Sequence, residues 1–261
     1  MANRVVRLPV LESGFGKTLR KDAWWVGPAL TVAVLSGFIV YATFRAFEGT
    51  GFRGPEVDGP YLSPFYSPFF STDWAKGTPL AFLTPAMLIL PGPASFRFTC
   101  YYYRKAYYRA FAMDPPACAV GERNAHKYNG ETQLLLFQNL HRFAMYVAVI
   151  FLAVLWKDAV EALFWKDGFH VGIGALVMVT NCLLLSAYTF GCHSFRHLVG
   201  GSVNSYSTAG AGDLRHQLWK LSTVLNERHQ LFAWMSLFSV ALTDLYIRCV
   251  SLHAIDDLRI F

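Results

Sequence analysis

Charged residues are scarce in this sequence of 261 amino acids: 15% are Asp, Glu, Lys or Arg, whereas 54% are hydrophobic. In an average soluble domain about a quarter of the residues are charged, so the composition argues against one. The five cysteines are odd in number and lack the dense spacing of a secreted disulfide framework. The first residues lack the short apolar stretch and small-residue cleavage site of a secretory signal, so we expect no cleaved signal peptide.

In place of charge the chain has apolar runs close to twenty residues long, which is the length of a helix that crosses the hydrocarbon core of a bilayer. We therefore predict an all-α protein, an integral membrane five-helix transmembrane bundle, forming a single anchor domain over residues 1–261. The predicted spans cover approximately residues 26–44, 79–99, 135–156, 170–191 and 229–250. The second span contains four prolines, so it should be kinked and packed inside the bundle.

The basic residues set the predicted orientation. With the N-terminus in the cytoplasm, sixteen of the 23 Lys and Arg residues fall on the cytoplasmic side and seven on the other, as the positive-inside rule requires. These residues lie between the apolar runs and form no basic stripe, so we do not expect nucleic-acid binding. The prediction is a multi-pass protein of the cell membrane with a cytoplasmic N-terminus.

Cysteine and histidine side chains gather at the predicted cytoplasmic ends of four spans. Cys100 closes the second span and His141 opens the third, while Cys192 and His193 follow the fourth and His229 opens the fifth. Polar side chains are costly at such positions unless they face a partner. Two thiolates and two imidazoles match either tetrahedral zinc or a Rieske-type [2Fe-2S] centre, and a pair of histidines alone would suit a b-type haem.

Other classes of membrane protein account for this pattern less well. A purely structural protein leaves the one-sided group of cysteines and histidines unexplained. A transporter is expected to carry ionisable residues near the bilayer midplane or internal repeats, and the sequence has neither. A zinc hydrolase would place an acidic base beside its ligands, as in the motif H-E-x-x-H, which is absent. An electron carrier best explains polar ligands among apolar helices.

Four blocks of the sequence resemble the single-chain membrane anchor of actinobacterial succinate dehydrogenase (complex II). They are RFTCYYYRKAYYRAF, YNGETQLLLFQNLHRF, LLLSAYTFGCHSFRHLVGG and LNERHQLFAWMSLFSVALTDLYIR. The resemblance implies a five-helix anchor in a bacterial plasma membrane. It also implies that a flavoprotein subunit and an iron-sulfur subunit dock on the cytoplasmic face, that the catalytic flavin site lies on a partner subunit, and that electrons from succinate pass to a quinone.

The resemblance leaves the redox cofactor open. Related anchors that hold two haems take axial histidines from helices one, two, four and five, whereas this chain has no histidine before His126. Two haems are therefore not expected. A Rieske-type [2Fe-2S] centre fits the set Cys100, His141, Cys192 and His229 better, with His193 as a reserve ligand. A single b-type haem held by two of the histidines, and a protein without a cofactor, are the alternatives.

A quinone site requires an apolar slot with a few polar groups that bind the quinone oxygens. The candidates for these contacts are Trp24, Tyr103, Arg142 and Arg228. Each of them could equally be an aromatic or basic anchor at the membrane interface.

Overall fold

The structure is a computed structural model that describes residues 14–54, 60–75, 77–123, 134–165, 168–201 and 203–260. Most of these residues are helical, and the strands are short. The chain divides into two compact units. The first unit comprises Met1–Gly37 and Tyr101–Leu134, and the second comprises Phe38–Cys100 and Leu135–Phe261.

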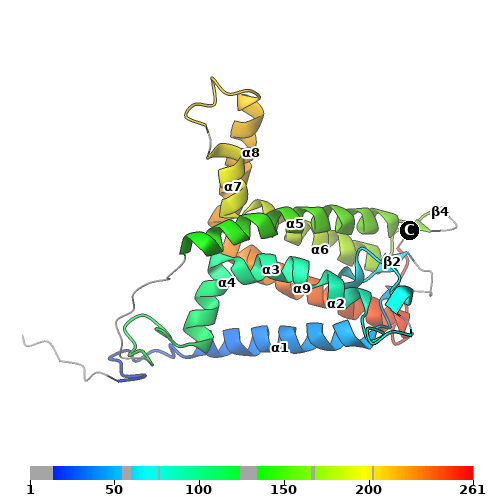
Figure 1. Ribbon diagram of the computed structural model, residues 1–261, viewed down its shortest axis with the longest axis horizontal. Coiled ribbons are helices and arrows are strands. Elements are labelled where there is room, and N and C mark those ends of the chain that lie inside the picture. Colours follow the sequence, from blue (N-terminus) through cyan, green and yellow to red (C-terminus); the bar gives the residue numbers. More distant parts are fainter. Residues whose placement is uncertain are drawn as a thin grey trace, which may run out of the picture. The chain divides into compact units, whose positions relative to one another are not determined.

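In the described part of the chain, four helices are long and apolar enough to cross a membrane. They are α1 (Val26–Glu48), α5 (Leu134–Glu161), α6 (Ile173–Phe190) and α9 (His229–Ser251) (Figure 1). They lie at four of the five predicted span positions. The boundary between the two units falls within α1, after Gly37.

The proline-rich segment predicted as the second span, residues 79–99, is not one helix. It begins with turns and continues as two short helices, α2 (Pro85–Ile89) and α3 (Pro91–Thr99). Pro91 has no N–H group to donate, so regular helical hydrogen bonding is interrupted there. Residues 85–99 would measure roughly 22 Å at the helical rise per residue, against about 30 Å for the hydrocarbon core. The number of spanning helices found among the described residues is therefore four.

The first unit holds α4 (Tyr101–Ala106), the π-helical turn η3 (Tyr107–Phe111) and the start of α1. Its two chain segments are joined by backbone hydrogen bonds. The N–H of Gly16 donates to the carbonyl oxygen of Gly121 at 3.0 Å, and the N–H of Gly121 donates to that of Lys17 at 2.8 Å. Arg20 adds a side-chain bond to the carbonyl oxygen of Cys118 at 2.9 Å.

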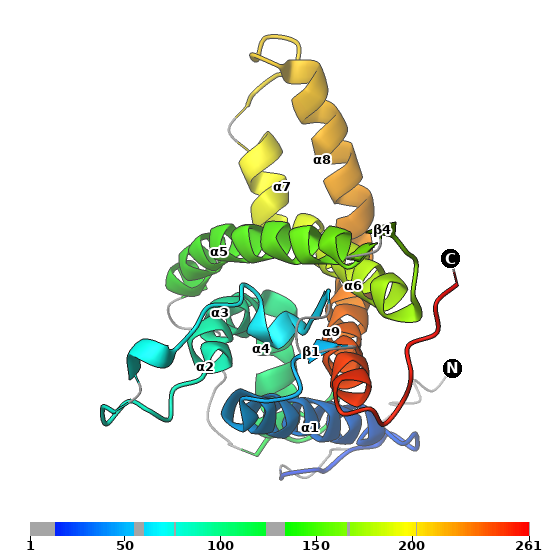
Figure 2. The same cartoon turned by 90° about the vertical axis from the view of Figure 1, so that its right-hand side faces the viewer.

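In the second unit α6 packs along α9, and α5 is joined to α6 by a hydrogen bond from Trp156 Nε1 to Ser186 Oγ at 3.0 Å (Figure 2). Small side chains allow this close approach. Ala159 and Ala175 are fully buried in the core beside Tyr61. A Cβ atom on Gly174 would lie 2.3 Å from the Tyr61 ring, so only glycine fits where α6 begins.

A buried charge network ties α1 to α9 at the end of the second unit where α1 stops. Arg45 and Asp244 are both fully buried, and Arg45 Nε lies 2.7 Å from Asp244 Oδ2. Asp244 also accepts hydrogen bonds from Tyr41 and Ser63. An unpaired charge would be very costly here, so these bonds fix the ends of α1 and α9 and the loop that carries Ser63.

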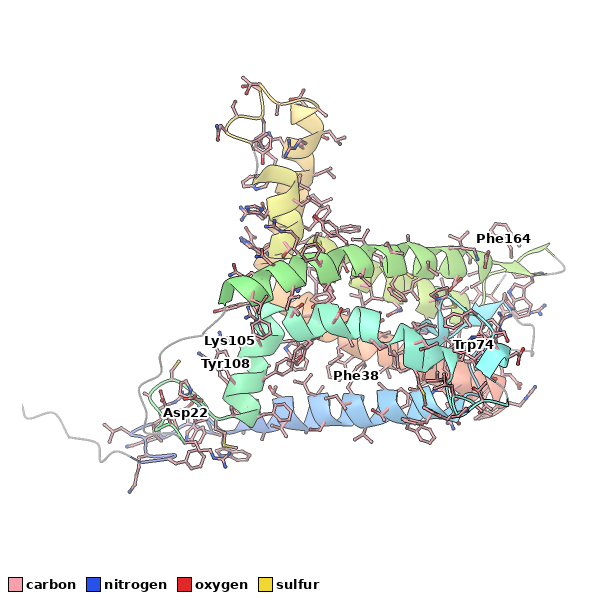
Figure 3. The ribbon with its side chains drawn as sticks, viewed as in Figure 1. Asp22, Phe38, Trp74, Lys105, Tyr108 and Phe164 are labelled. Atoms are coloured by element: carbon pink, nitrogen blue, oxygen red, sulfur yellow. The ribbon has the colours of Figure 1, made fainter. Side chains whose placement is uncertain are left out.

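The short elements of the second unit lie at this same end, where Figure 3 labels Trp74 and Phe164. They are β1 (Arg53–Gly54), β2 (Tyr61–Leu62), β3 (Phe164–Trp165), β4 (Gly168–Phe169), η1 (Pro64–Tyr66) and η2 (Asp73–Ala75). Strands β1 and β2 pair antiparallel, and so do β3 and β4. The C-terminal segment returns to this end, where Asp257 accepts hydrogen bonds from the hydroxyls of Tyr61 and Tyr246 and from the N–H of Gly174.

At the opposite end, α7 (His193–Gly200) and α8 (Gly212–Glu227) form a hairpin that runs crosswise to α5 (Figures 1 and 2). Arg196 Nε donates to Thr223 Oγ1 at 2.9 Å, and Arg215 Nε donates to the carbonyl oxygen of Val199 at 2.8 Å. α8 is followed directly by α9, and the two helices are separated at Arg228, whose φ of −112° and ψ of 20° are not helical.

Large apolar side chains remain exposed along the long helices. Examples are Ile39 on α1, Ile150 on α5, Leu183 on α6 and Leu242 on α9, each at least 55% exposed. Soluble proteins rarely expose so much contiguous apolar surface. In a bilayer the lipid chains cover it, and the helices satisfy their own backbone hydrogen bonds.

Candidate redox site

Two cysteines and two histidines that are far apart in the sequence meet at one end of the second unit. Cys100 follows α3, His141 lies in α5, Cys192 is the N-cap residue of α7 and His229 begins α9. All four side chains are buried, with exposed fractions between 2% and 8%. The sequence predicted this convergence from the positions of these residues at span ends.

The four donors are arranged as two pairs, each with one thiol and one imidazole. The Nε2 atom of His141 lies 3.0 Å from the Sγ atom of Cys192, and the Nε2 atom of His229 lies 3.9 Å from the Sγ atom of Cys100. Burial raises the pKa of the Cys192 thiol to about 11, and the neighbouring Cys100 adds to the rise. The two pairs lie side by side, because the rings that stack on their imidazoles, Phe96 and Tyr188, have centroids 5.2 Å apart.

Local structure explains how Cys192 comes to face the site. α6 ends at Phe190, and Gly191 and Cys192 form the corner before α7. The Cys192 backbone is extended (φ −66°, ψ 140°), and its Sγ accepts a hydrogen bond from the N–H of Ser194. An N-cap position commonly uses a side-chain acceptor in this way. The corner is held by Asn226 of α8, which donates to the carbonyl oxygen of Gly191 at 2.8 Å.

Aromatic rings support both imidazoles, and the sequence did not single them out. Phe96 stacks on His141 with 4.7 Å between ring centroids and 4° between planes. Tyr188 stacks on His229 at 4.9 Å and 14°. Phe96 lies one turn before Cys100 and Tyr188 lies four residues before Cys192, so proximity in sequence to the cysteines was the available signal.

Thr99 is a further neighbour that the sequence did not single out. Its hydroxyl donates to the carbonyl oxygen of Ser95 at 2.8 Å, and its Oγ1 lies 2.9 Å from Nδ1 of His141. A hydroxyl that donates elsewhere is left to accept, so Nδ1 of His141 carries the proton. Nε2 then presents its lone pair on the side of Cys192, as a metal-binding histidine requires.

His193, the reserve ligand, is exposed at the first position of α7. Among the described residues, no three His, Cys, Asp or Glu side chains are placed so that they could hold one metal ion. The donor chemistry nevertheless fits a two-iron centre, because two thiols and two imidazoles are the ligands of the Rieske type. Ligation by this set stays a prediction.

The four candidate quinone contacts lie in different surroundings. In the first unit, Trp24 is half-buried just before α1, and Tyr103 is buried in α4. In the second unit, Arg142 is half-buried on α5, with Nη2 3.4 Å from Nδ1 of His197, and Arg228 is exposed between α8 and α9. The role of each in quinone binding stays a prediction.

Comparison with known proteins gives two matches. The family model described as actinobacterial succinate dehydrogenase subunit SdhC matches residues 26–253. A chain of the Mycobacterium smegmatis Sdh1 complex, solved in the apo form, is 39% identical, with a TM-score of 0.81 over 100% of this chain and 98% of that chain. No curated protein matches.

The family match covers well over half of the chain, and the identity extends along its whole length. Together with four apolar helices of spanning length, these findings make it a multi-pass cell-membrane protein that partners the other subunits of its enzyme. The chain belongs to the actinobacterial SdhC family and is the membrane-anchor subunit of a succinate dehydrogenase.

Proposed function

We propose that this anchor carries electrons from succinate to a quinone through a Rieske-type [2Fe-2S] centre held by Cys100, Cys192, His141 and His229. The observation that carries the proposal is the burial of these two kinds of donor, from four separate elements, at one end of the second unit. When bound, such a centre transfers one electron at a time, and its histidine ligands raise the reduction potential.

The protein's own residues prepare this site. The surrounding rings of Phe96 and Tyr188 exclude water and hold the two imidazoles in fixed planes. Thr99 fixes the tautomer of His141 that can bind iron through Nε2. Burial raises the pKa of the Cys192 thiol and so disfavours its thiolate, and because cysteine binds metals as the thiolate, a centre held here would displace that proton.

We propose five membrane crossings, with the N-terminus in the cytoplasm. The broken segment α2–α3 supports a fifth crossing because its two ends contact opposite ends of the second unit. Thr84, which caps α2, donates to the carbonyl oxygen of Ala46 near the end of α1. Cys100, which follows α3, reaches His229 at the start of α9. The segment therefore spans the unit, although its helices are short and interrupted.

The orientation rests on the distribution of basic residues, five of which (Arg4, Arg7, Lys76, Lys127 and Lys166) lie outside the described residues. In this orientation the Cys and His site lies at the cytoplasmic face. A flavoprotein subunit that oxidises succinate and an iron-sulfur subunit would dock there and supply electrons. The relative in the M. smegmatis Sdh1 complex supports such an assembly.

The test is low-temperature EPR combined with optical spectroscopy on the purified complex. We expect a reduced-state [2Fe-2S] signal whose average g value is below that of an all-cysteine cluster, in addition to the signals of the partner subunits. An optical spectrum with haem bands and no such EPR signal would assign the site to a b-type haem. The absence of both signals would reject a redox centre in the anchor.

A further inference from the structure

Helices α7 and α8 form a hairpin that projects from one end of the second unit, crosswise to α5 (Figures 1 and 2). Because α5 is long and apolar enough to cross a membrane, a hairpin that runs crosswise to it lies along the membrane surface. The hairpin starts after the end of α6 and leads into α9, and both of these helices are candidate spans. Its root therefore lies at the depth where two spans end.

The exposed side chains of α8 separate into an apolar side and a polar side. The apolar stripe consists of side chains three or four residues apart, a spacing that places them on one side of a helix: Leu214, Leu218, Leu221 and Val224. Their exposed fractions lie between 37% and 62%. The polar stripe consists of exposed charged side chains seven residues apart: Asp213, Lys220 and Glu227. α8 is therefore an amphipathic helix whose apolar side is exposed.

Contacts with α7 and α6 fix the rotation of α8 about its axis. The guanidinium carbon of Arg196 lies 4.7 Å from the ring centroid of Trp219, and Arg196 Nε donates to Thr223 Oγ1 at 2.9 Å. Ser222 Oγ donates to the carbonyl oxygen of Phe190 at 2.9 Å. Trp219, Ser222 and Thr223 therefore form the side of α8 that faces the rest of the unit, and the apolar stripe lies on a different side.

The apolar side of the hairpin continues to the end of α6. Leu225, four residues after Leu221, packs against Gly191, where an added Cβ atom would lie 3.0 Å from the Cβ atom of Leu225. In α7, the ring centroid of Phe195 lies 5.0 Å from that of Phe190, the last residue of α6. The apolar side of the hairpin is thus adjacent to a candidate span, which lies in hydrocarbon.

We propose that the α7–α8 hairpin lies in the interface of the bilayer and that lipid acyl chains cover its apolar stripe. An amphipathic helix in this position buries its apolar side roughly 5–10 Å into the boundary between headgroups and acyl chains. The polar stripe then faces water. The leaflet is the one at the candidate redox site, because Cys192 directly precedes the hairpin. The lipid contact does not depend on whether a metal binds at that site.

The position of the stripe favours lipid over a protein partner. A soluble subunit that docks from the aqueous phase meets the polar side of the hairpin, whereas the apolar stripe faces the membrane. Tyr206 and Trp219, whose ring centroids lie 6.3 Å apart, belong to the same hairpin, and these two residue types are enriched at membrane interfaces. An apolar side toward hydrocarbon and a charged side toward water is the arrangement of an interfacial helix.

The experiment places a fluorescent NBD label on either side of α8 in the complete complex, reconstituted in vesicles of phosphatidylcholine and phosphatidylglycerol. Leu221→Cys labels the apolar stripe, and Lys220→Cys is the matched control on the polar stripe. Both are made with Cys118→Ser and Cys249→Ser, because these two cysteines are not buried. The complex with the two serine replacements alone gives the background fluorescence.

Two quenchers report the surroundings of each label. Lipids that carry a nitroxide near the headgroup end of the acyl chain quench from the membrane, and iodide on both sides of the vesicle quenches from water. We expect the label at position 221 to lose fluorescence with the nitroxide lipids and to be protected from iodide. The label at position 220 should show the reverse pattern.

A second pair of variants tests whether the hairpin lies along the surface over its whole length. Leu214 precedes Leu221 by two helical turns, roughly 10 Å further from the start of α9, and Asp213 is its polar neighbour. We expect Leu214→Cys to be quenched by the nitroxide lipids to the same extent as Leu221→Cys, and Asp213→Cys to be quenched by iodide.

Three results would overturn the proposal. Equal quenching by iodide at positions 220 and 221 would show that the stripe lies in water. Protection of position 221 from both quenchers would assign the stripe to a protein partner or to a second copy of the chain. Nitroxide quenching at position 221 but not at position 214 would show that the hairpin rises away from the membrane.

Discussion

The Oγ1 atom of Thr99 lies 2.9 Å from Nδ1 of His141, on the side of the imidazole ring opposite the nitrogen that faces Cys192. Thr99 directly precedes Cys100, which is one predicted ligand, and it contacts the ring of His141, which is another. Because the Thr99 hydroxyl donates to Ser95, it acts as an acceptor for His141. It therefore controls which ring nitrogen is available to a metal.

Replacement of Thr99 by valine removes this acceptor without a large change of volume. We expect the centre to bind about 10–100-fold more weakly, the usual cost of losing a partner of a metal-binding histidine. The EPR line shape and the reduction potential should also shift. Thr99→Ser keeps the hydroxyl and should restore both properties. If Val and Ser give the same potential and occupancy, Thr99 has no role in positioning His141.

The buried ion pair of Arg45 and Asp244 should dominate the stability of the end of the unit where it lies. Asp244→Asn leaves the guanidinium without its main counter-charge, and we expect a loss of about 3–5 kcal/mol. Thermal unfolding of the detergent-solubilised anchor, followed by circular dichroism, measures it. Glu48→Gln is the matched control, because Glu48 also pairs with Arg45 but is partly exposed, and it should cost about 1 kcal/mol or less. Equal losses for both variants would contradict the assigned role.

Alkaline pH should weaken the contact between Tyr61 and the C-terminal segment. Burial, followed by the hydrogen bond to Asp257, raises the pKa of the Tyr61 hydroxyl above its usual value. Because the pKa is higher in the folded than in the unfolded state, the contact contributes fully to the free energy of unfolding below the unfolded-state pKa of about 10. This contribution is lost as the pH rises from that value toward the folded-state pKa.

Tyr61→Phe removes this titration, so its stability should fall less steeply above pH 10. The slope does not vanish, because burial also raises the pKa of Tyr66. Denaturant midpoints measured at several alkaline pH values test the difference. A variant whose stability has the same pH slope as the unmodified protein would show that Tyr61 does not contribute.

The proposed orientation can be tested with a membrane-impermeant maleimide. Cys118 is exposed and not in a disulfide, and the proposed topology puts it in the cytoplasm. We expect it to react in inside-out vesicles and not in intact spheroplasts. Lys157→Cys, in a Cys118→Ser background, should show the reverse pattern, because the exposed Lys157 lies near the opposite end of α5. The opposite result for both sites would invert the topology.

The sequence predicted the long helices well because the length of an apolar run is enough to identify a span. It also placed Cys100, His141, Cys192 and His229 at one face, since antiparallel spans bring alternate helix ends together. The prolines of residues 79–99 predicted a kink, but not that the helix would divide at Pro91, and nothing in the sequence indicated the break at Arg228, because local propensity does not determine whether a helix bends or stops.

Contacts between distant residues were also beyond the sequence. Arg45 and Asp244 are 199 positions apart, and nothing local indicates that they pair. The same holds for the stacking of Tyr188 on His229. Such features depend on the rotation of each helix about its axis, which packing against neighbouring helices sets.

The most direct test of the account compares Cys192→Ser with Cys182→Ser in the purified complex. Both cysteines are buried, but Cys192 contacts His141 whereas Cys182 packs in the core around Tyr61. The measurement is low-temperature EPR of the succinate-reduced enzyme, with iron and acid-labile sulfide determined on the same samples. We expect Cys192→Ser to lose the mixed-ligand [2Fe-2S] signal and its iron, and Cys182→Ser to keep both. An unchanged signal in Cys192→Ser would contradict the assignment of the centre to this site.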